Sequence, residues 1–222
     1  MADMHNARRV MVDNQIRTFD VTDRDVLAAF DAVPRELFVS EKDRAIAYAD
    51  RTIALGDARR AMLPPLLLAR LVQALQPQAG ERALDVLSGT GYPAAILSEI
   101  GLDVTVLESD TALAELAKVA LAASGSNAQV MPVQADLGAD KVVAPAGGGF
   151  DVILLNGAAE REPRAFFPLL KDGGRLGVFV REAGACRALV YVKSGSHVSP
   201  RRAFDALAPV LPGFAAEAGF VF

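Results

Sequence analysis

Two glycines stand where they could let a small organic ligand approach the backbone. Gly89 and Gly91 lie in the stretch DVLSGTGY at residues 85–92, where an apolar run gives way to a helical pattern. A glycine has no Cβ to obstruct a ligand, and the start of the following helix offers free N–H groups. The spacing therefore predicts a strand, a ligand-binding loop and a helix.

Two acidic residues follow later strands at positions that suit a nucleoside. Glu108 ends the apolar run 104–107, about 20 residues beyond the loop, where a carboxylate can accept hydrogen bonds from both ribose hydroxyls. Asp136 follows the next strand, where it could accept from an adenine amino group. Either residue could instead be a solvated acid at a strand end. Ligands of open α/β sheets bind at the carboxyl ends of strands, which favours the joint interpretation.

The loop favours S-adenosylmethionine (SAM) over a dinucleotide. A dinucleotide loop carries a third glycine, but here Gly91 is followed by Tyr92, Pro93 and Ala94. Asp85, on the strand itself, suits the cationic amino acid end of SAM. The predicted cofactor-binding residues are Asp85, Val86, Leu87, Gly89, Gly91, Glu108, Ser109, Asp136, Leu137 and Asn156.

From residue 80 onward, apolar runs alternate with helical patterns. Strands are expected at 82–87, 103–107, 129–133, 151–155, 174–180, 187–193 and 217–222, and helices at 92–100, 111–123 and 162–170. This alternation predicts an α/β fold with a mostly parallel central sheet and helices on both faces, the Rossmann-like arrangement of class I SAM-dependent methyltransferases. Residues 80–222 would form this core.

The first 79 residues are expected to form a helical extension packed on that core. Residues 11–47 predict two helical pieces, with N-cap residues at 20–23 and a stop at Pro34. Residues 51–65 look irregular, and Pro64-Pro65 opens a helix over 66–75. We expect one structural unit.

Composition excludes several classes of function. The net charge is −4, and the tightest basic runs are Arg-Arg pairs with acids nearby, so we expect no nucleic-acid partner. One cysteine and two distant histidines offer no disulfide, zinc site or other metal centre. No leader or membrane-spanning stretch is recognisable, so we expect no membrane partner and a cytoplasmic location.

Several stretches carry a family resemblance. MVDNQI at 11–16, VPRELFV at 33–39, IALG at 53–56, the loop region 84–97 and LKDGGRL at 170–176 are similar to protein-L-isoaspartate O-methyltransferases. The resemblance implies SAM as cofactor and repair of isoaspartyl residues in peptides or proteins by methylation of their α-carboxylate. It assigns no catalytic residue.

Two departures from the family pattern leave an alternative open. The family's Gln-Thr-Ile-Ser-x-Pro segment reads RRAMLPP at 59–65, so its serine falls on Met62 or Leu63. Arg59 or Arg60 could pair with a substrate carboxylate, although we favour a surface role for both. Leu87 stands where the family has glycine. The alternatives are a re-purposed or non-catalytic SAM-binding paralogue, or a methyltransferase acting on a small carboxylate.

Overall fold

The computed structural model describes residues 2–56, 60–133, 137–138, 142, 147–182 and 184–216. Its main sheet has seven strands in the order β5-β4-β3-β6-β7-β8-β9. Pairing is parallel from β5 through β7, and β8 and β9 pair antiparallel at the end of the sheet. The strands are β3 (Arg82–Val86), β4 (Asp103–Glu108), β5 (Gln129–Pro132), β6 (Phe150–Ala159), β7 (Leu170–Glu182), β8 (Ala185–Ser194) and β9 (His197–Asp205).

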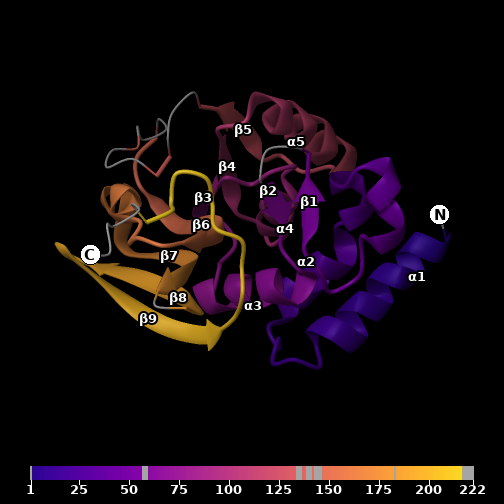
Figure 1. Ribbon diagram of the computed structural model, residues 1–222, viewed down its shortest axis with the longest axis horizontal. Coiled ribbons are helices and arrows are strands. Elements are labelled where there is room, and N and C mark those ends of the chain that lie inside the picture. Colours follow the sequence, from indigo (N-terminus) through magenta and orange to yellow (C-terminus); the bar gives the residue numbers. More distant parts are fainter. Residues whose placement is uncertain are drawn as a thin grey trace, which may run out of the picture.

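Helices and a small hairpin complete the molecule. In Figure 1 the N-terminal helices gather on one side and β7, β8 and β9 on the other. The helical elements are α1 (Ala2–Met11), a π-helical turn (Val12–Ile16), α2 (Arg24–Ala32), 3₁₀ turns (Arg35–Phe38, Glu41–Ile46 and Arg164–Leu169), α3 (Pro65–Leu75), α4 (Tyr92–Glu99) and α5 (Thr111–Ser124). The hairpin joins β1 (Ile53–Leu55) to β2 (Arg60–Met62).

Buried side chains alternate between the two faces of the sheet. Val152 and Leu154 of β6 join a cluster with α3, α4, α5 and the N-terminal helices, whereas Ile153 and Leu155 join a second cluster. Among the described residues, the second cluster is closed by the 3₁₀ turn Arg164–Leu169 and by residues near Phe214. The predicted Rossmann-like sheet is thereby confirmed.

The N-terminal elements follow local signals. Asp23 caps α2 by accepting hydrogen bonds from the N–H groups of Asp25 and Val26, at 2.9 and 3.1 Å. Pro64 precedes α3 and Pro65 is its first residue, where a missing N–H costs nothing. Both features agree with the sequence interpretation.

Four elements differ from expectation. Helix α1 lies at residues 2–11, ahead of the interval 11–47 for which helices were predicted. The helix expected at 162–170 is only a 3₁₀ turn, because Pro168 lies inside it and cannot continue an α-helix. Strand β9 was missed, although Gly195-Ser196 is a two-residue turn of the kind that joins antiparallel strands. The interval 51–65 contains the β1–β2 hairpin. The strand expected at 217–222 lies outside the described residues.

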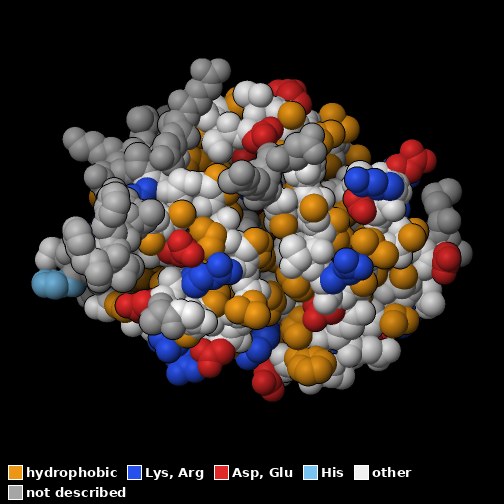
Figure 2. All heavy atoms as spheres, in the orientation of Figure 1, with side chains coloured by type: hydrophobic (Ala, Val, Ile, Leu, Met, Phe, Trp, Pro, Cys, Tyr) orange, Lys and Arg blue, Asp and Glu red, His pale blue; other side chains and the backbone are white. Residues whose placement is uncertain are grey.

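The surface view in Figure 2 shows basic and acidic side chains interspersed over this face of the molecule. None of the helices in the described part of the chain is both long and apolar enough to cross a membrane.

Candidate cofactor site

The loop after β3 adopts left-handed backbone conformations at three positions. Leu87, Gly89 and Gly91 have φ angles of +55°, +65° and +93°. The Leu87 N–H donates to Leu107 O at 2.8 Å, which fixes the turn against β4. A side chain in this conformation costs about 1–2 kcal/mol, so leucine is a strained choice at residue 87.

Side chains of the protein itself pack against both glycines. A Cβ at Gly89 would lie 2.5 Å from Leu55 Cδ1, so β1 covers that residue. A Cβ at Gly91 would lie 3.1 Å from Leu121 Cγ, so this glycine lets α4 pack against α5. Both positions favour glycine through backbone conformation, and a side chain at either would also displace a neighbouring leucine.

A buried acid lies beneath the loop. Asp85 is fully buried and accepts hydrogen bonds from Ser88 Oγ and Asn156 Nδ2. Burial raises its pKa to about 7, although the bonds from Ser88 and Asn156 oppose the shift. Asn156 Nδ2 also donates to Val86 O at 3.0 Å. Asn156 Oδ1 is a buried acceptor with no hydrogen-bond partner among the described residues.

Beside Asp85, Glu108 forms a buried, bidentate ion pair with Arg60. Arg60 Nη1 donates to Glu108 Oε1 at 2.7 Å and Nη2 donates to Oε2 at 2.9 Å. The Gly89 and Asp110 N–H groups donate to the same carboxylate at 2.8 and 3.1 Å. Arg60 Nη2 also donates to Leu87 O. The side chains of Arg60 and Glu108 are 4% and 0% exposed.

The surface role expected for Arg60 is wrong, and Arg59 lies outside the described residues. Arg60 and Met62 are two positions apart in β2 and therefore point to the same face, and both are buried. The interpretation of 51–65 as irregular hid this alternation. A strand assignment would have directed Arg60 inward with Met62.

The predicted site residues divide into three groups. Side-chain or backbone hydrogen bonds join most of them around the loop: Asp85, Val86, Leu87, Gly89, Gly91, Glu108 and Asn156. Leu137 is buried in the same apolar cluster as Leu87, and Ser109 is half-buried beside Glu108. Asp136 lies outside the described residues.

Sequence reasoning missed the part played by Arg35, from the VPRELFV stretch. This fully buried side chain donates to Ala47 O at 2.8 Å and to Leu63 O at 2.6 Å. Its guanidinium carbon lies 4.7 Å from the centre of the Tyr92 ring, and burial lowers its pKa. Thr90 Oγ1 adds a bond to Phe38 O at 2.6 Å. The stretch therefore ties the loop and α4 to the chain around β2.

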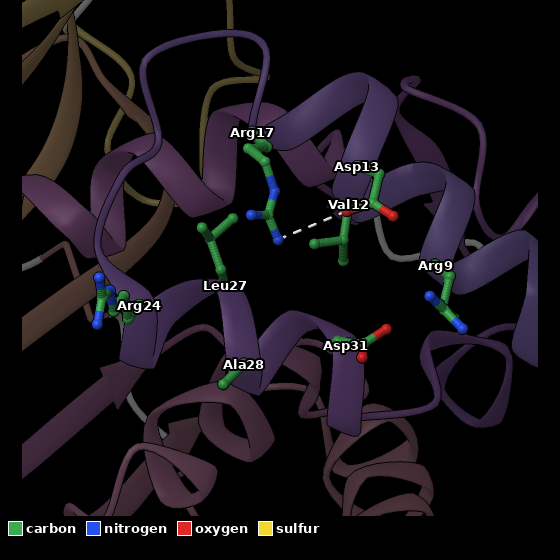
Figure 3. Close-up of a pocket in the computed structure, with 8 residues that line it drawn as sticks. All are labelled: Arg9, Val12, Asp13, Arg17, Arg24, Leu27, Ala28 and Asp31. Carbon is green, nitrogen blue, oxygen red and sulfur yellow. Dashed lines mark ion pairs between the residues drawn. The ribbon is translucent and has the colours of Figure 1, made fainter.

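A separate pocket lies on the N-terminal helices (Figure 3). Arg9, Asp13, Arg17, Arg24 and Asp31 line it together with apolar residues, and Arg17 pairs with Asp13 at 3.5 Å. Its lining includes no residue of β3, β4 or the loop between β3 and α4. With three basic and two acidic groups, its charges largely cancel.

Comparisons with known proteins identify the family. The model of the protein-L-isoaspartate (D-aspartate) O-methyltransferase family matches residues 6–205. A protein-L-isoaspartate O-methyltransferase of Methylorubrum extorquens is 33% identical over 213 residues, covering 95% of this chain and 91% of the relative. Another, from Rhodopseudomonas palustris, is 38% identical over 170 residues, covering 76% of this chain and 67% of the relative.

Solved structures share the fold. One protein-L-isoaspartate O-methyltransferase has a TM-score of 0.77 at 21% identity, covering 94% of this chain and 65% of its own. A Plasmodium falciparum protein, solved with S-adenosyl-L-homocysteine, has the same TM-score at 18% identity, covering 93% of this chain and 98% of its own. By its sequence match over residues 6–205, the chain belongs to the protein-L-isoaspartate O-methyltransferase family.

Proposed function

We propose that this protein transfers a methyl group from SAM to the α-carboxylate of an isoaspartyl residue in a peptide or protein. The observation that carries the proposal is the family match over residues 6–205, which includes the loop and its acidic neighbours. The result is a methyl ester, the first step in repair of the isoaspartyl linkage.

The donor and acceptor groups at the loop suit SAM on one condition. Asp85 and Asn156 Oδ1, which has no partner within the described part of the chain, form a buried acceptor pair that suits the ammonium group at the amino acid end. Glu108 lies at the end of β4, where a carboxylate suits two ribose hydroxyls. The condition is that Arg60 leaves Glu108, because the guanidinium now bonds to both carboxylate oxygens.

The reaction asks little acid–base chemistry of the protein. SAM, when bound, supplies an electrophilic methyl group. The acceptor carboxylate is already ionised at neutral pH, so its oxygen would bond to the methyl group without a general base and no proton moves. The S–CH3 bond would break, its electron pair would stay on sulfur, and S-adenosylhomocysteine would leave. The protein must align the two groups and exclude water. Met62 and Leu63, at the position of the family's serine, are buried and their side chains have no hydrogen-bond donor, so other groups must hold the acceptor carboxylate.

The proposal also covers a second class of methyl acceptor and the cellular location of the protein. A small carboxylate is the second acceptor class to test, because the departure at Met62 and Leu63 removes the family's hydroxyl donor. A cytoplasmic location is part of the same proposal, and cell fractionation tests it.

A methyl-transfer assay tests the function directly. We expect purified protein with methyl-labelled SAM to form a labelled ester on an isoaspartyl peptide, and to form none on the matched aspartyl peptide. Glu108→Gln should lose most activity, whereas Glu115→Gln, which changes an exposed glutamate on α5, should not. No ester and no released methanol at saturating SAM would refute the proposal.

A further inference from the structure

Every acceptor position of the Glu108 carboxylate is engaged. The two oxygens receive two hydrogen bonds from Arg60 and one each from the Gly89 and Asp110 N–H groups. A carboxylate offers about four lone-pair positions, so two ribose hydroxyls can bond to it only by displacing a present donor. The backbone donors are held in place by the loop after β3 and by the cap of α5, which leaves the Arg60 side chain as the donor that can leave.

The hairpin that carries Arg60 also covers the loop. Leu55 and Arg60 are opposite each other in the β1–β2 ladder, so they form one end of the hairpin. Leu55 packs on Gly89, while Arg60 bonds to Leu87 O as well as to Glu108. One cross-strand pair therefore covers both the backbone of the loop and the carboxylate beside it.

We propose that Arg60 competes with the cofactor for Glu108, so that SAM binds only after the guanidinium has left the carboxylate. This inference rests on the proposed function of the site. Arg60 is a positioning residue here: it sets the closed state from which binding starts. A cofactor that must displace an internal partner binds more weakly than its own contacts allow. Its apparent affinity is reduced in proportion to the fraction of molecules in which Arg60 has left Glu108.

Titration calorimetry with SAM and with S-adenosylhomocysteine tests the inference. We expect Arg60→Ala to bind both at least tenfold more tightly than the wild type. Arg60→Lys keeps the charge but loses the two-pronged geometry, and should give an intermediate affinity. If the alanine variant does not fold, the Arg60→Lys variant tests the inference in its place. The matched control is Arg175→Lys, which weakens a second Arg–Glu pair outside the loop and should leave both affinities unchanged.

Hydrogen exchange supplies a readout independent of activity. Saturating S-adenosylhomocysteine should speed amide exchange at 53–55 and 60–62 in the wild type, because the hairpin loses its contact with Glu108. Equal, measurable affinities in wild type and Arg60→Ala, or hairpin amides slowed by the ligand, would overturn the competition while leaving the methyltransferase proposal intact. No binding by either protein would overturn both.

Discussion

Two arginine–glutamate pairs in this protein have the same bond lengths and opposite positions. Arg60–Glu108 and Arg175–Glu81 each form two parallel hydrogen bonds of 2.7 and 2.9 Å. Glu108 ends β4 at the carboxyl edge of the sheet, whereas Glu81 precedes β3 at the amino edge. The same contact therefore occurs at the edge where α/β proteins bind ligands and at the edge where they do not.

The surroundings of the two pairs explain their different roles. Arg175 also donates to Leu75 O and Gln76 O at 3.0 and 2.7 Å, so it fastens the end of α3 to the sheet. Burial alone would raise the pKa of Glu81, but hydrogen bonds from Arg175 and Gln78 lower it below its ordinary value. Arg60 instead donates to Leu87 O in the loop after β3. Under the proposed function, similar geometry therefore serves structure at one edge of the sheet and cofactor access at the other.

Replacing Arg60 should have the largest effect on the free energy of unfolding, and replacing Arg175 should have a smaller one. Arg60→Ala leaves a fully buried carboxylate without its counter-ion, so we expect it to lower the free energy of unfolding by about 3–5 kcal/mol. Arg175→Ala affects a pair whose side chains are 17% and 21% exposed, and should cost about 1–3 kcal/mol. Urea unfolding measures both. A larger loss at Arg175 would contradict the comparison.

The pH dependence of stability should report the buried acid next to Glu108. The pKa of Asp85 is about 7, above the value of about 3.9 for an unfolded aspartate. The folded protein therefore holds this proton more tightly, and stability should fall as pH rises from about 4 through 7, by at most about 4 kcal/mol.

Asp85→Asn isolates that effect, because an amide does not titrate. The variant should flatten the fall in unfolding midpoint between pH 5 and 8. Asp151→Asn is the matched control at the amino edge, where the bonds from Lys171 and Arg82 leave the pKa of Asp151 lowered despite partial burial. A wild-type midpoint that rises over this interval would contradict the assignment.

At the strained leucine, the informative quantity is a smaller difference between two variants. Leu87→Ala removes a side chain that is 2% exposed and should cost about 2–5 kcal/mol. Leu87→Gly removes the same packing but relieves a φ of +55°, so we expect it to be about 1 kcal/mol more stable than the alanine variant. Comparing thermal midpoints of the two variants tests this order. An alanine variant more stable than the glycine variant would show that residue 87 carries no backbone strain.

The exposed ion pair in Figure 3 should have the smallest effect on the free energy of unfolding. Arg17 and Asp13 have side chains 60% and 53% exposed and are four residues apart. Arg17→Ala should change the free energy of unfolding by about 0.5 kcal/mol or less, and added salt should reduce even that. Urea unfolding at two ionic strengths checks it, and a loss above about 1 kcal/mol would show a role that the exposed geometry does not explain.

Strong local patterns made the sheet predictable. The run Asp151–Leu155 is apolar enough to identify a buried parallel strand, and Asp23 identifies the start of α2. Predictions were wrong for elements with weaker patterns, where a single residue or a short turn determines the structure. Pro168 limits the helix near 162–170 to a 3₁₀ turn, and the short turn Gly195-Ser196 introduces β9.

The candidate site was harder to predict because its closure depends on tertiary contacts. The loop and its acids follow from strand order, so Asp85 and Glu108 could be placed from sequence. The position of Arg60 follows from a three-residue strand whose partner lies across a turn, and so short a segment has no clear periodicity. The contact of Leu55 with Gly89 likewise cannot be predicted from the sequence.

A crystal structure of the complex with S-adenosylhomocysteine tests the central claim most directly. The account predicts ribose hydroxyls within hydrogen-bond distance of Glu108, with the Arg60 guanidinium no longer bonded to that carboxylate. The Arg175–Glu81 pair should be unchanged in the same crystal. Bound ligand with Arg60 still joined to both Glu108 oxygens would contradict the account.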